Sequence, residues 1–464
     1  MASTVELPLW LVLLALVLAA IAALDRVLMP SARWFLRRRM ERLVARLNTR
    51  LDRPIEPFKL MRRQDLIARL VYDRQVLQAV SEHALENGLP EPVAFQEAQT
   101  YAREIVPGFS ALVYFGFAMR AARWLSRALY RVRIGKVDAA LARIDRKATV
   151  IFVMNHRSNM DYVLVTWLVA NRSALSYAVG EWARIWPLSA LIRSMGAYFI
   201  RRGSRNTLYR RVLARYVQMA TADGTTQAVF PEGGLSLTGR VGEAKMGLLS
   251  YILAGFDPAS HDVVFVPTAI AYDRVLEDRV LVAAGQAGNR KFRASPLAMA
   301  GFVVRMLWMK LRGVFPGFGT AAVAFGAPVS LRDYMGCGAA STEGLGAVLM
   351  AEVAQSMPIL PVPLVAAAMV DGPVSRAELS AKVAAIVARL QAMGAVLKLP
   401  PAGTEAAIAE GLRALLARGM VQDSPAGLAV VPDKDSLLQF YAASVVQRIE
   451  VGGHASPKAA NYIQ

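Results

Sequence analysis

Six short apolar runs, separated by stretches with helical periodicity, limit what this chain can fold into more than any other feature. They lie at 148–154, 174–179, 196–200, 226–230, 263–271 and 321–326. Strand-like runs that alternate with helices indicate an α/β domain with a mostly parallel or mixed core sheet flanked by helices. Ligands of such sheets bind beyond the carboxyl ends of the strands. Polar motifs that directly follow a run are therefore the first candidates for a functional site.

A histidine, His156, follows the first run, and an aspartate, Asp161, comes five residues later. We expect His156 in the turn after the strand and Asp161 in the first turn of the next helix, within reach of the imidazole. The carboxylate would fix the tautomer and leave the other ring nitrogen free as a base. Chance pairs with this spacing are common, so the pair alone leaves a packed or surface histidine equally open.

Two adjacent arginines, Arg201 and Arg202, follow the third run. Arginine binds phosphate through two parallel hydrogen bonds, so this pair is a candidate phosphate site. A pair of ordinary surface arginines is the alternative.

A glycine-rich turn follows the fourth run. Its candidate contributors are Glu232, Gly233, Gly234, Arg240 and Lys245. The glycines allow a tight turn and a close approach of the backbone to a ligand. The carboxylate would order the site, and the two cations would add positive charge. Pro267, inside the fifth run, predicts a strand bend that forms a pocket wall.

The segment Leu7–Leu24 carries no charge over 18 residues, and arginines follow it. As a helix it would be about 27 Å long, close to one bilayer core. We therefore expect a transmembrane anchor at 1–25, with the rest of the chain in the cytoplasm by the positive-inside rule. A buried core helix is the alternative.

Charge is strongly unbalanced, with 54 Lys and Arg against 35 Asp and Glu. Such an excess indicates an anionic partner, either nucleic acid, anionic lipid or a phosphorylated substrate. Within 109–133, four arginines recur at spacings of three and four among aromatic residues, which is typical of a helix at a membrane surface. A nucleic-acid-binding helix is less favoured, because no zinc-finger, RNP-type or basic-zipper signature is present.

The remaining organisation is simple. We expect four regions: 1–25 as the anchor, 26–140 as a helical membrane-associated region, 141–335 as the α/β domain and 336–464 as a mainly helical domain. A helix opened by a capping box at Ser375 and Glu378, a helix over 404–417 and a hairpin near 424–427 resemble a winged helix. One cysteine and four dispersed histidines argue against a disulfide framework and a metal site.

Taken together, the motifs resemble the four ordered blocks of the glycerolipid acyltransferases, and most of all the bacterial glycerol-3-phosphate acyltransferases. The blocks are His156–Tyr162, Gly196–Arg202, Phe230–Gly234 with Thr238–Arg240, and Val266–Pro267. Further likeness lies at Glu97–Ile105 and Leu437–Ser444.

The resemblance implies an inner-membrane acyltransferase that faces the cytoplasm and needs neither cofactor nor metal. It would move an acyl group from acyl-CoA or acyl carrier protein to glycerol 3-phosphate. His156 would be the general base and Asp161 its partner. The acceptor phosphate would bind Arg201, Arg202, Arg240 and Lys245, and the pocket would include Arg157, Ser158, Glu232, Gly233, Gly234, Thr238 and Pro267.

One departure affects the acceptor. The third block of this family carries arginines where this chain has Leu235 and Leu237. Lysophosphatidate or another lysolipid is therefore an alternative acceptor. A membrane-anchored basic scaffold or a nucleic-acid-binding protein is the alternative outside enzymes.

Overall fold

The structure is a computed structural model of the chain. It describes residues 8–453 apart from 24–34, 36, 37, 39–41, 43, 50, 136–140, 143, 170–172, 181–187, 202, 289–300, 302–304, 307, 310, 311, 314–316, 337–340 and 426. The chain forms two compact units, one of Met1–Ile55 with Asn171–Ser173, and one of Glu56–Ala170 with Ala174–Gln464.

The prediction of an N-terminal transmembrane helix is contradicted. Helix α1 (Leu9–Ala23) has 15 residues, which is about 22 Å at 1.5 Å per residue, whereas a spanning helix needs about 20 residues. In the part of the chain that the structure describes, no helix is both long and apolar enough to cross a membrane.

The larger unit is built on one mixed sheet, as the sequence predicts. Its strands are β1 (Arg131–Ile134), β2 (Thr149–Met154), β3 (Ser176–Val179), β4 (Tyr198–Phe199), β5 (Gln227–Val229), β6 (Val263–Tyr272), β7 (Thr320–Phe325) and β8 (Val329–Ser330). The order is β1-β7-β6-β2-β5-β3-β4, and β8 pairs with β6. Strands β2 to β6 run parallel to one another, while β7 and β8 are antiparallel to β6. The carboxyl ends of five strands therefore share one edge.

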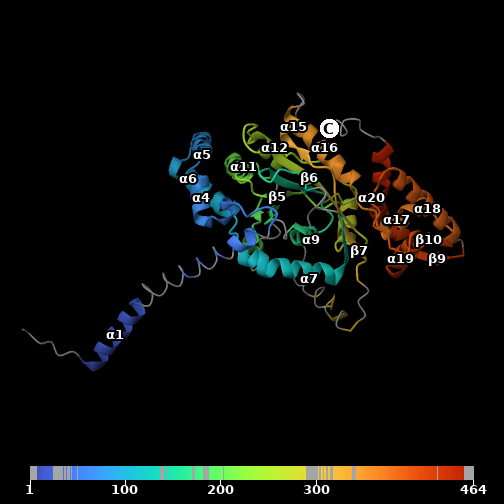
Figure 1. Cartoon of the computed structure of the whole chain (residues 1–464), viewed down its shortest axis with the longest axis horizontal. Coiled ribbons are helices and arrows are strands. Elements are labelled where there is room, and N and C mark those ends of the chain that lie inside the picture. The colour runs from blue at the N-terminus through green and yellow to red at the C-terminus, as the bar shows by residue number, and fades with distance from the viewer. Residues whose placement is uncertain are drawn as a thin grey trace, which may run out of the picture. The chain divides into compact units, whose positions relative to one another are not determined.

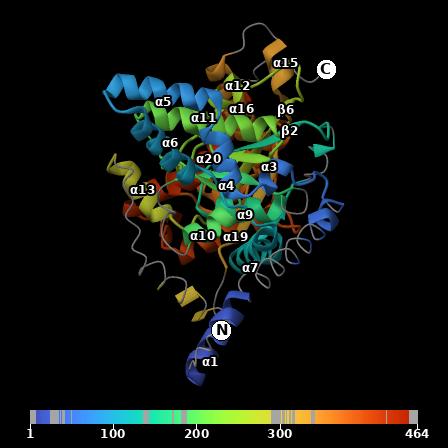
Figure 2. The same cartoon turned by 90° about the vertical axis from the view of Figure 1, so that its left-hand side faces the viewer.

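Strand β2 occupies the middle of this sheet, and its sequence TVIFVM explains why. Every residue of β2 is buried, which is the pattern of a parallel strand covered on both faces. Helices α11 (Thr207–Ala222), α12 (Gly247–Ala254) and α16 (Thr342–Gln355) lie on one face. Helices α7 (Met119–Leu129) and α9 (Met160–Val169) lie on the other (Figures 1 and 2).

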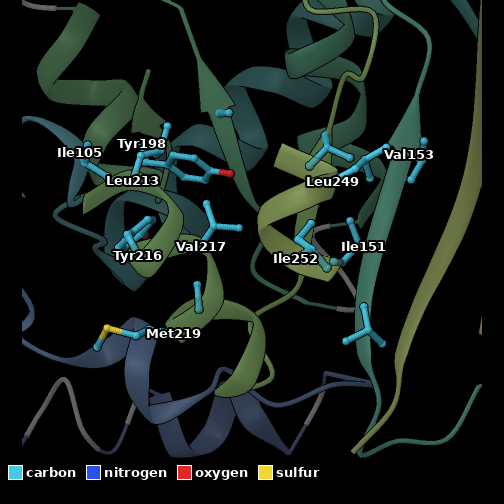
Figure 3. Packing of buried hydrophobic residues seen from close by; sticks show 14 of the residues in the cluster. Ile105, Ile151, Val153, Tyr198, Leu213, Tyr216, Val217, Met219, Leu249 and Ile252 are labelled. Atoms are coloured by element: carbon cyan, nitrogen blue, oxygen red, sulfur yellow. The ribbon is translucent and has the colours of Figure 1, made fainter. Parts of the chain in front are cut away.

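The main hydrophobic core fills the space between the sheet and α11. Figure 3 shows Ile151 and Val153 of β2 facing Leu249 and Ile252 of α12, with Val217 of α11 beside them. Full burial of one such aliphatic side chain contributes roughly 1.5–3 kcal/mol. Helices α4 (Arg63–Val71), α5 (Arg74–Asn87) and α6 (Glu91–Ile105) extend this core outward.

The C-terminal elements also match their sequence signals. They comprise α15 (Leu331–Gly336), α17 (Pro361–Ala368), α18 (Arg376–Ala392), α19 (Thr404–Ala417), the β9 (Val421–Ser424) and β10 (Gly427–Val430) hairpin, and α20 (Asp435–Gly453). Both hydrogen bonds of the predicted capping box are present at Ser375 and Glu378. Helix α17 packs between α19 and α20 (Figure 1).

Candidate active site

The candidate site begins where β2 ends. Met154 is the last residue of the strand. The next residue, Asn155, is tied to β6: its Oδ1 accepts the backbone N–H of Ile270 at 2.8 Å, and its Nδ2 donates to Ile270 O at 3.0 Å. His156 follows in the turn and is 2% exposed. Asp161 lies in the first turn of α9 and is 0% exposed. The strand and the helix thus fix both residues at the carboxyl edge of the sheet.

The two side chains are hydrogen bonded. His156 Nδ1 lies 2.9 Å from Asp161 Oδ2, and the same oxygen accepts the backbone N–H groups of Arg157 at 2.7 Å and Ser158 at 3.0 Å. Because Oδ2 acts as an acceptor throughout, Nδ1 carries the proton and Nε2 presents its lone pair. Within the described residues, no hydrogen bond to Nε2 is formed.

A tyrosine that the sequence did not single out as a site residue completes the hydrogen bonding of the Asp161 carboxylate. Tyr272, the last residue of β6, donates its hydroxyl to Asp161 Oδ1 at 2.7 Å. Burial, followed by the neighbouring Asp161 charge, raises the Tyr272 pKa well above its ordinary value, so the phenol stays protonated and donates. Both carboxylate oxygens of Asp161 therefore accept hydrogen bonds, which fix the side chain in place. The two partners are 111 positions apart in the sequence, so no local motif reveals this contact.

A second carboxylate, that of Glu232, orders the turn that carries His156. Glu232 Oε1 accepts the backbone N–H of His156 at 3.0 Å. Burial raises the Glu232 pKa to about 7, while that hydrogen bond and the nearby Arg157 guanidinium lower it in part. The sequence predicted an ordering role for Glu232, and its contact is with the histidine backbone.

A third carboxylate, Glu277, was not predicted at all. It accepts the hydroxyl of Ser158 at 2.7 Å and both the backbone N–H and side-chain amide of Asn159 at 3.2 and 3.1 Å. Ser158 Oγ in turn accepts the backbone N–H of Met160 as α9 begins. Ser158 thus links the catalytic turn to Glu277 and to the helix.

The glycine-rich turn packs directly on the histidine. Ser236 donates its backbone N–H to His156 O at 2.8 Å. Gly233 has φ +66°, and a β-carbon there would lie 2.9 Å from Lys245 Cδ, so this glycine lets the lysine side chain approach. Lys245 is exposed, and among the described residues it forms no ion pair. Gly234 is buried in the same turn, and Thr238 is exposed and accepts the backbone N–H of Arg240 at 3.3 Å.

The other predicted phosphate ligands have carboxylate partners. Arg201 forms a bidentate pair with Glu104 of α6, at 2.9 and 2.7 Å, and its guanidinium lies over the ring of Tyr209. Strands β5 and β3 separate β4 from β2, which puts Arg201 roughly 14 Å to the side of His156 at about 4.8 Å per strand. Arg240 pairs with Glu450 of α20. Arg202 lies outside the described residues.

Pro267 lies inside strand β6, and the strand bend predicted there is not seen. Strand β6 runs unbroken through it, and Pro267 is buried in the sheet. Before Pro267, β6 pairs with β8, and after it, β6 pairs with β7. A proline lacks the N–H that a continuous ladder would need, so it fits the point at which the neighbouring strand changes.

Aromatic rings and one buried arginine form the walls around His156. The Phe230 ring lies 4.3 Å and the Tyr162 ring 5.3 Å from the imidazole, centroid to centroid. The Arg157 guanidinium is buried 6.0 Å from the Phe440 ring centroid, and its Nε finds no hydrogen-bond partner among the residues that the structure describes. Burial lowers the Arg157 pKa, partly offset by Glu232 and Asp161. No group of three or more His, Cys, Asp or Glu suited to a metal occurs in the described part of the chain.

Comparisons with known proteins agree with this architecture. Residues 138–271 match the acyltransferase family model, and residues 306–446 match the model of the glycerol-3-phosphate acyltransferase C-terminal region. The chain is 30% identical over 283 residues to the glycerol-3-phosphate acyltransferase of Aeromonas hydrophila, covering 60% of this chain and 34% of that protein. It is 29% identical over 282 residues to the Haemophilus ducreyi protein of the same name, covering 60% and 33%.

The chain thus spans about a third of the length of these curated relatives. Among solved structures, the 1-acyl-sn-glycerophosphate (LPA) acyltransferase of Thermotoga maritima matches with a TM-score of 0.31 and 18% identity, over 55% of this chain and 78% of that one. The sheet, the buried His–Asp pair and the first matched region define an acyltransferase domain. Through the second matched region, the chain is also similar to the C-terminal region of the glycerol-3-phosphate acyltransferases.

Proposed function

We propose that this protein transfers a fatty acyl group from a thioester donor, acyl-CoA or acyl carrier protein, to the sn-1 hydroxyl of glycerol 3-phosphate. The product would be lysophosphatidic acid. One observation carries the proposal above all: a buried His156 whose Nδ1 is bonded to Asp161, while Nε2 is free to take a proton. The names of the curated relatives support the choice of acceptor.

The chemistry follows from this pair. His156 Nε2 takes the proton of the acceptor hydroxyl as its oxygen attacks the thioester carbonyl. Asp161 stabilises the imidazolium that forms, and its own position is held by the Tyr272 hydroxyl and two backbone N–H groups. The tetrahedral intermediate then collapses, the C–S bond breaks, and the imidazolium returns the proton to the leaving thiolate. No acyl-enzyme forms in this sequence.

The acceptor phosphate needs cations near the turn. Lys245 is the most available of the predicted ligands, because it is exposed beside Gly233 and forms no ion pair within the described residues. Arg201 and Arg240 would have to exchange Glu104 and Glu450 for the phosphate. Both of their side chains are about 40% exposed, which leaves them accessible for such an exchange.

A lysophospholipid acceptor is the second candidate. Leu235 and Leu237 flank Ser236, whose backbone N–H bonds His156 O, so the neighbours of this contact in the turn are apolar. An acyl chain on the acceptor would be accommodated better there than a bare polar substrate.

A direct comparison of acceptors tests the proposal. Purified full-length protein would be given palmitoyl-CoA with glycerol 3-phosphate or with lysophosphatidate, and Lys245→Gln would be assayed in parallel. Preference for glycerol 3-phosphate, with a raised acceptor KM in the variant, supports the proposal. Preference for lysophosphatidate keeps the chemistry and replaces the acceptor.

We also propose that the protein works at a membrane surface through α7 and the π-helical segment Leu112–Ala118 that precedes it. The exposed side of this segment carries Leu112, Phe117 and Trp124, which are 57–61% exposed, next to Arg120 and Arg123. The opposite side packs on α9. Aromatic rings flanked by arginines, with no acidic residue on α7, suit an anionic lipid surface.

A further inference from the structure

A cationic groove lies beside the candidate active site and is separate from the predicted phosphate ligands. It has a volume of about 800 Å³ and is formed by the end of α7, the start of β1, the turn after β6 and one side of α19. That volume is in the range of pockets that bind small molecules and cofactors. All of these elements belong to the larger unit.

Five arginines line the groove: Arg127, Arg131, Arg274, Arg413 and Arg418. The only acidic residues in its lining are Asp273 and Glu410. Positive charge therefore exceeds negative charge by three within one concave surface. Such a surface focuses the field and attracts a multiply charged anion.

Some of the charged side chains in the groove are already paired and so are less available to a ligand. Arg418 is held by Asp278 and Tyr441, and Arg131 pairs with Glu410. Asp273 is fully engaged, because its two oxygens accept the backbone N–H groups of Thr320 and Val362 at 2.7 and 2.9 Å.

Three arginines remain for a ligand. Arg274 lies over the Phe318 ring at 4.5 Å, and Arg127 lies over the Trp167 ring at 5.5 Å. Arg413 is exposed and makes no ion pair with any residue that the structure describes. None of the three guanidinium groups is neutralised by a carboxylate in the described chain, so they match the charge of a group with several phosphates.

The groove is also close to the His–Asp pair. Tyr130 in its wall packs on Tyr272, with ring centroids 5.2 Å apart, and Tyr272 donates to Asp161. One side chain, that of Tyr272, therefore separates the groove wall from the Asp161 carboxylate. In a coenzyme A thioester, the pantetheine arm separates the reacting carbonyl from the phosphates, so the phosphates need a site beside the base and not on it.

We propose that this groove binds the nucleotide phosphates of a coenzyme A thioester and so selects the acyl donor. The inference rests on the proposed function, because it assigns the donor of that reaction. A concave groove of about 800 Å³ favours a nucleotide over an acidic carrier protein, which would need a broad surface.

Two donors that share one thioester but differ in their phosphates distinguish phosphate binding from the acyl-transfer chemistry. Palmitoyl-CoA and palmitoyl-pantetheine would be compared in the full-length protein, its Arg127→Gln/Arg413→Gln double variant and an Arg389→Gln control. Arg389 is an exposed arginine of α18 outside the groove. We expect the double variant to raise the KM for palmitoyl-CoA about tenfold, which is ~1.4 kcal/mol, with kcat and all palmitoyl-pantetheine kinetics unchanged.

Binding is measured separately by calorimetry with adenosine 3′,5′-bisphosphate and no acceptor. The expected result is binding to the wild type and to the control, weakened about tenfold in the double variant. Equal losses with both donors, or no change with either, would overturn the inference. Because this arm needs no turnover, a failure of the acyl-transfer proposal is distinguishable from a failure of the groove.

Discussion

Asp161 is fully buried and receives four hydrogen bonds, and this convergence is the strongest chemical signal in the part of the chain that the structure describes. A carboxylate held so tightly can fix one imidazole tautomer throughout a reaction. Asp161→Asn keeps the size of the side chain but replaces the acceptor that holds the Nδ1 proton. We expect kcat to fall about 10³–10⁴-fold, as in other His–Asp pairs, with the donor KM little changed.

Steady-state kinetics of Asp161→Asn, with circular dichroism as the test of folding, would measure this loss. A kcat within threefold of the wild type in a folded variant would show that the carboxylate is structural. Tyr272→Phe is a useful companion, since it removes one of the four donors and should cause a smaller loss than Asp161→Asn.

The raised pKa of Glu232 predicts how the free energy of unfolding depends on pH. Its folded-state pKa, about 7, lies above the ordinary value of 4.5. The folded protein therefore keeps a proton that the unfolded chain releases, and stability falls as pH rises from about 4.5 to 7. A shift of this size corresponds to about 3 kcal/mol. Glu232→Gln has no such proton, and its amide oxygen can still accept the His156 N–H.

Urea unfolding at several pH values between 5 and 8 measures this effect. The free energy of unfolding of the wild type should decrease relative to that of Glu232→Gln as pH rises, and the difference should level off above pH 7. Parallel curves for the two proteins would mean that Glu232 ionises in the fold as it does in water.

At the scale of elements, α7 carries the proposed membrane contact. Trp124 lies on its exposed side, and Phe117 is exposed seven residues earlier in the π-helical segment Leu112–Ala118, so both would enter a lipid interface together. The double variant Phe117→Ser/Trp124→Ser should lose most of its binding to vesicles of phosphatidylglycerol and phosphatidylcholine, while its activity on a soluble short-chain donor persists.

Vesicle sedimentation measures that loss, and Tyr72→Ser provides a matched control because Tyr72 is an exposed aromatic residue that is 65% exposed on another helix end. Unchanged sedimentation of the α7 double variant would assign membrane binding to another part of the chain. Release of the wild type by added nucleic acid would indicate that the arginines serve a different polyanion.

Local signals predicted the elements well because their causes are local. The buried run TVIFVM gave β2, and the Ser375–Glu378 box gave the start of α18. The site was predictable only where its parts adjoin in sequence, as His156 and Asp161 do. Tyr272 and Glu277 contact the same turn from 111 and more residues away, and nothing local encodes such contacts.

The same limit explains the arginines. Arg201 and Arg240 follow strands as a phosphate site requires, but the sequence does not reveal that Glu104 and Glu450 come to meet them. For the N-terminus, hydropathy over 18 residues predicted a spanning helix, whereas α1 has 15. The run of apolar residues and the length of the helix that forms are different quantities.

At the scale of the whole larger unit, α20 connects the C-terminal region to the catalytic turn. Gln447 bonds both backbone groups of Val241, at 2.8 and 2.9 Å. Gly239, with φ +78°, passes so close to the helix that a β-carbon would lie 1.9 Å from Phe440 O. The turn that bonds His156 O is therefore shaped by a helix 200 residues further along the chain.

Gln447→Ala should leave two buried backbone groups of Val241 without partners, at a cost of about 1–3 kcal/mol. We expect a lower unfolding temperature and a kcat reduced several-fold, because the turn next to His156 loses its support. Gln439→Ala, an exposed glutamine on the same helix, is the control. Equal behaviour of the two variants in both assays would show that α20 does not support the site.

The most direct test of the central claim is acyl transfer itself, with palmitoyl-CoA and glycerol 3-phosphate, in the wild type, His156→Ala and His83→Ala. His83 lies on α5, away from the sheet edge. We expect lysophosphatidic acid from the wild type and from His83→Ala, and less than about 0.1% of that rate from a folded His156→Ala. Comparable turnover by His156→Ala would contradict the assignment of His156 as the base.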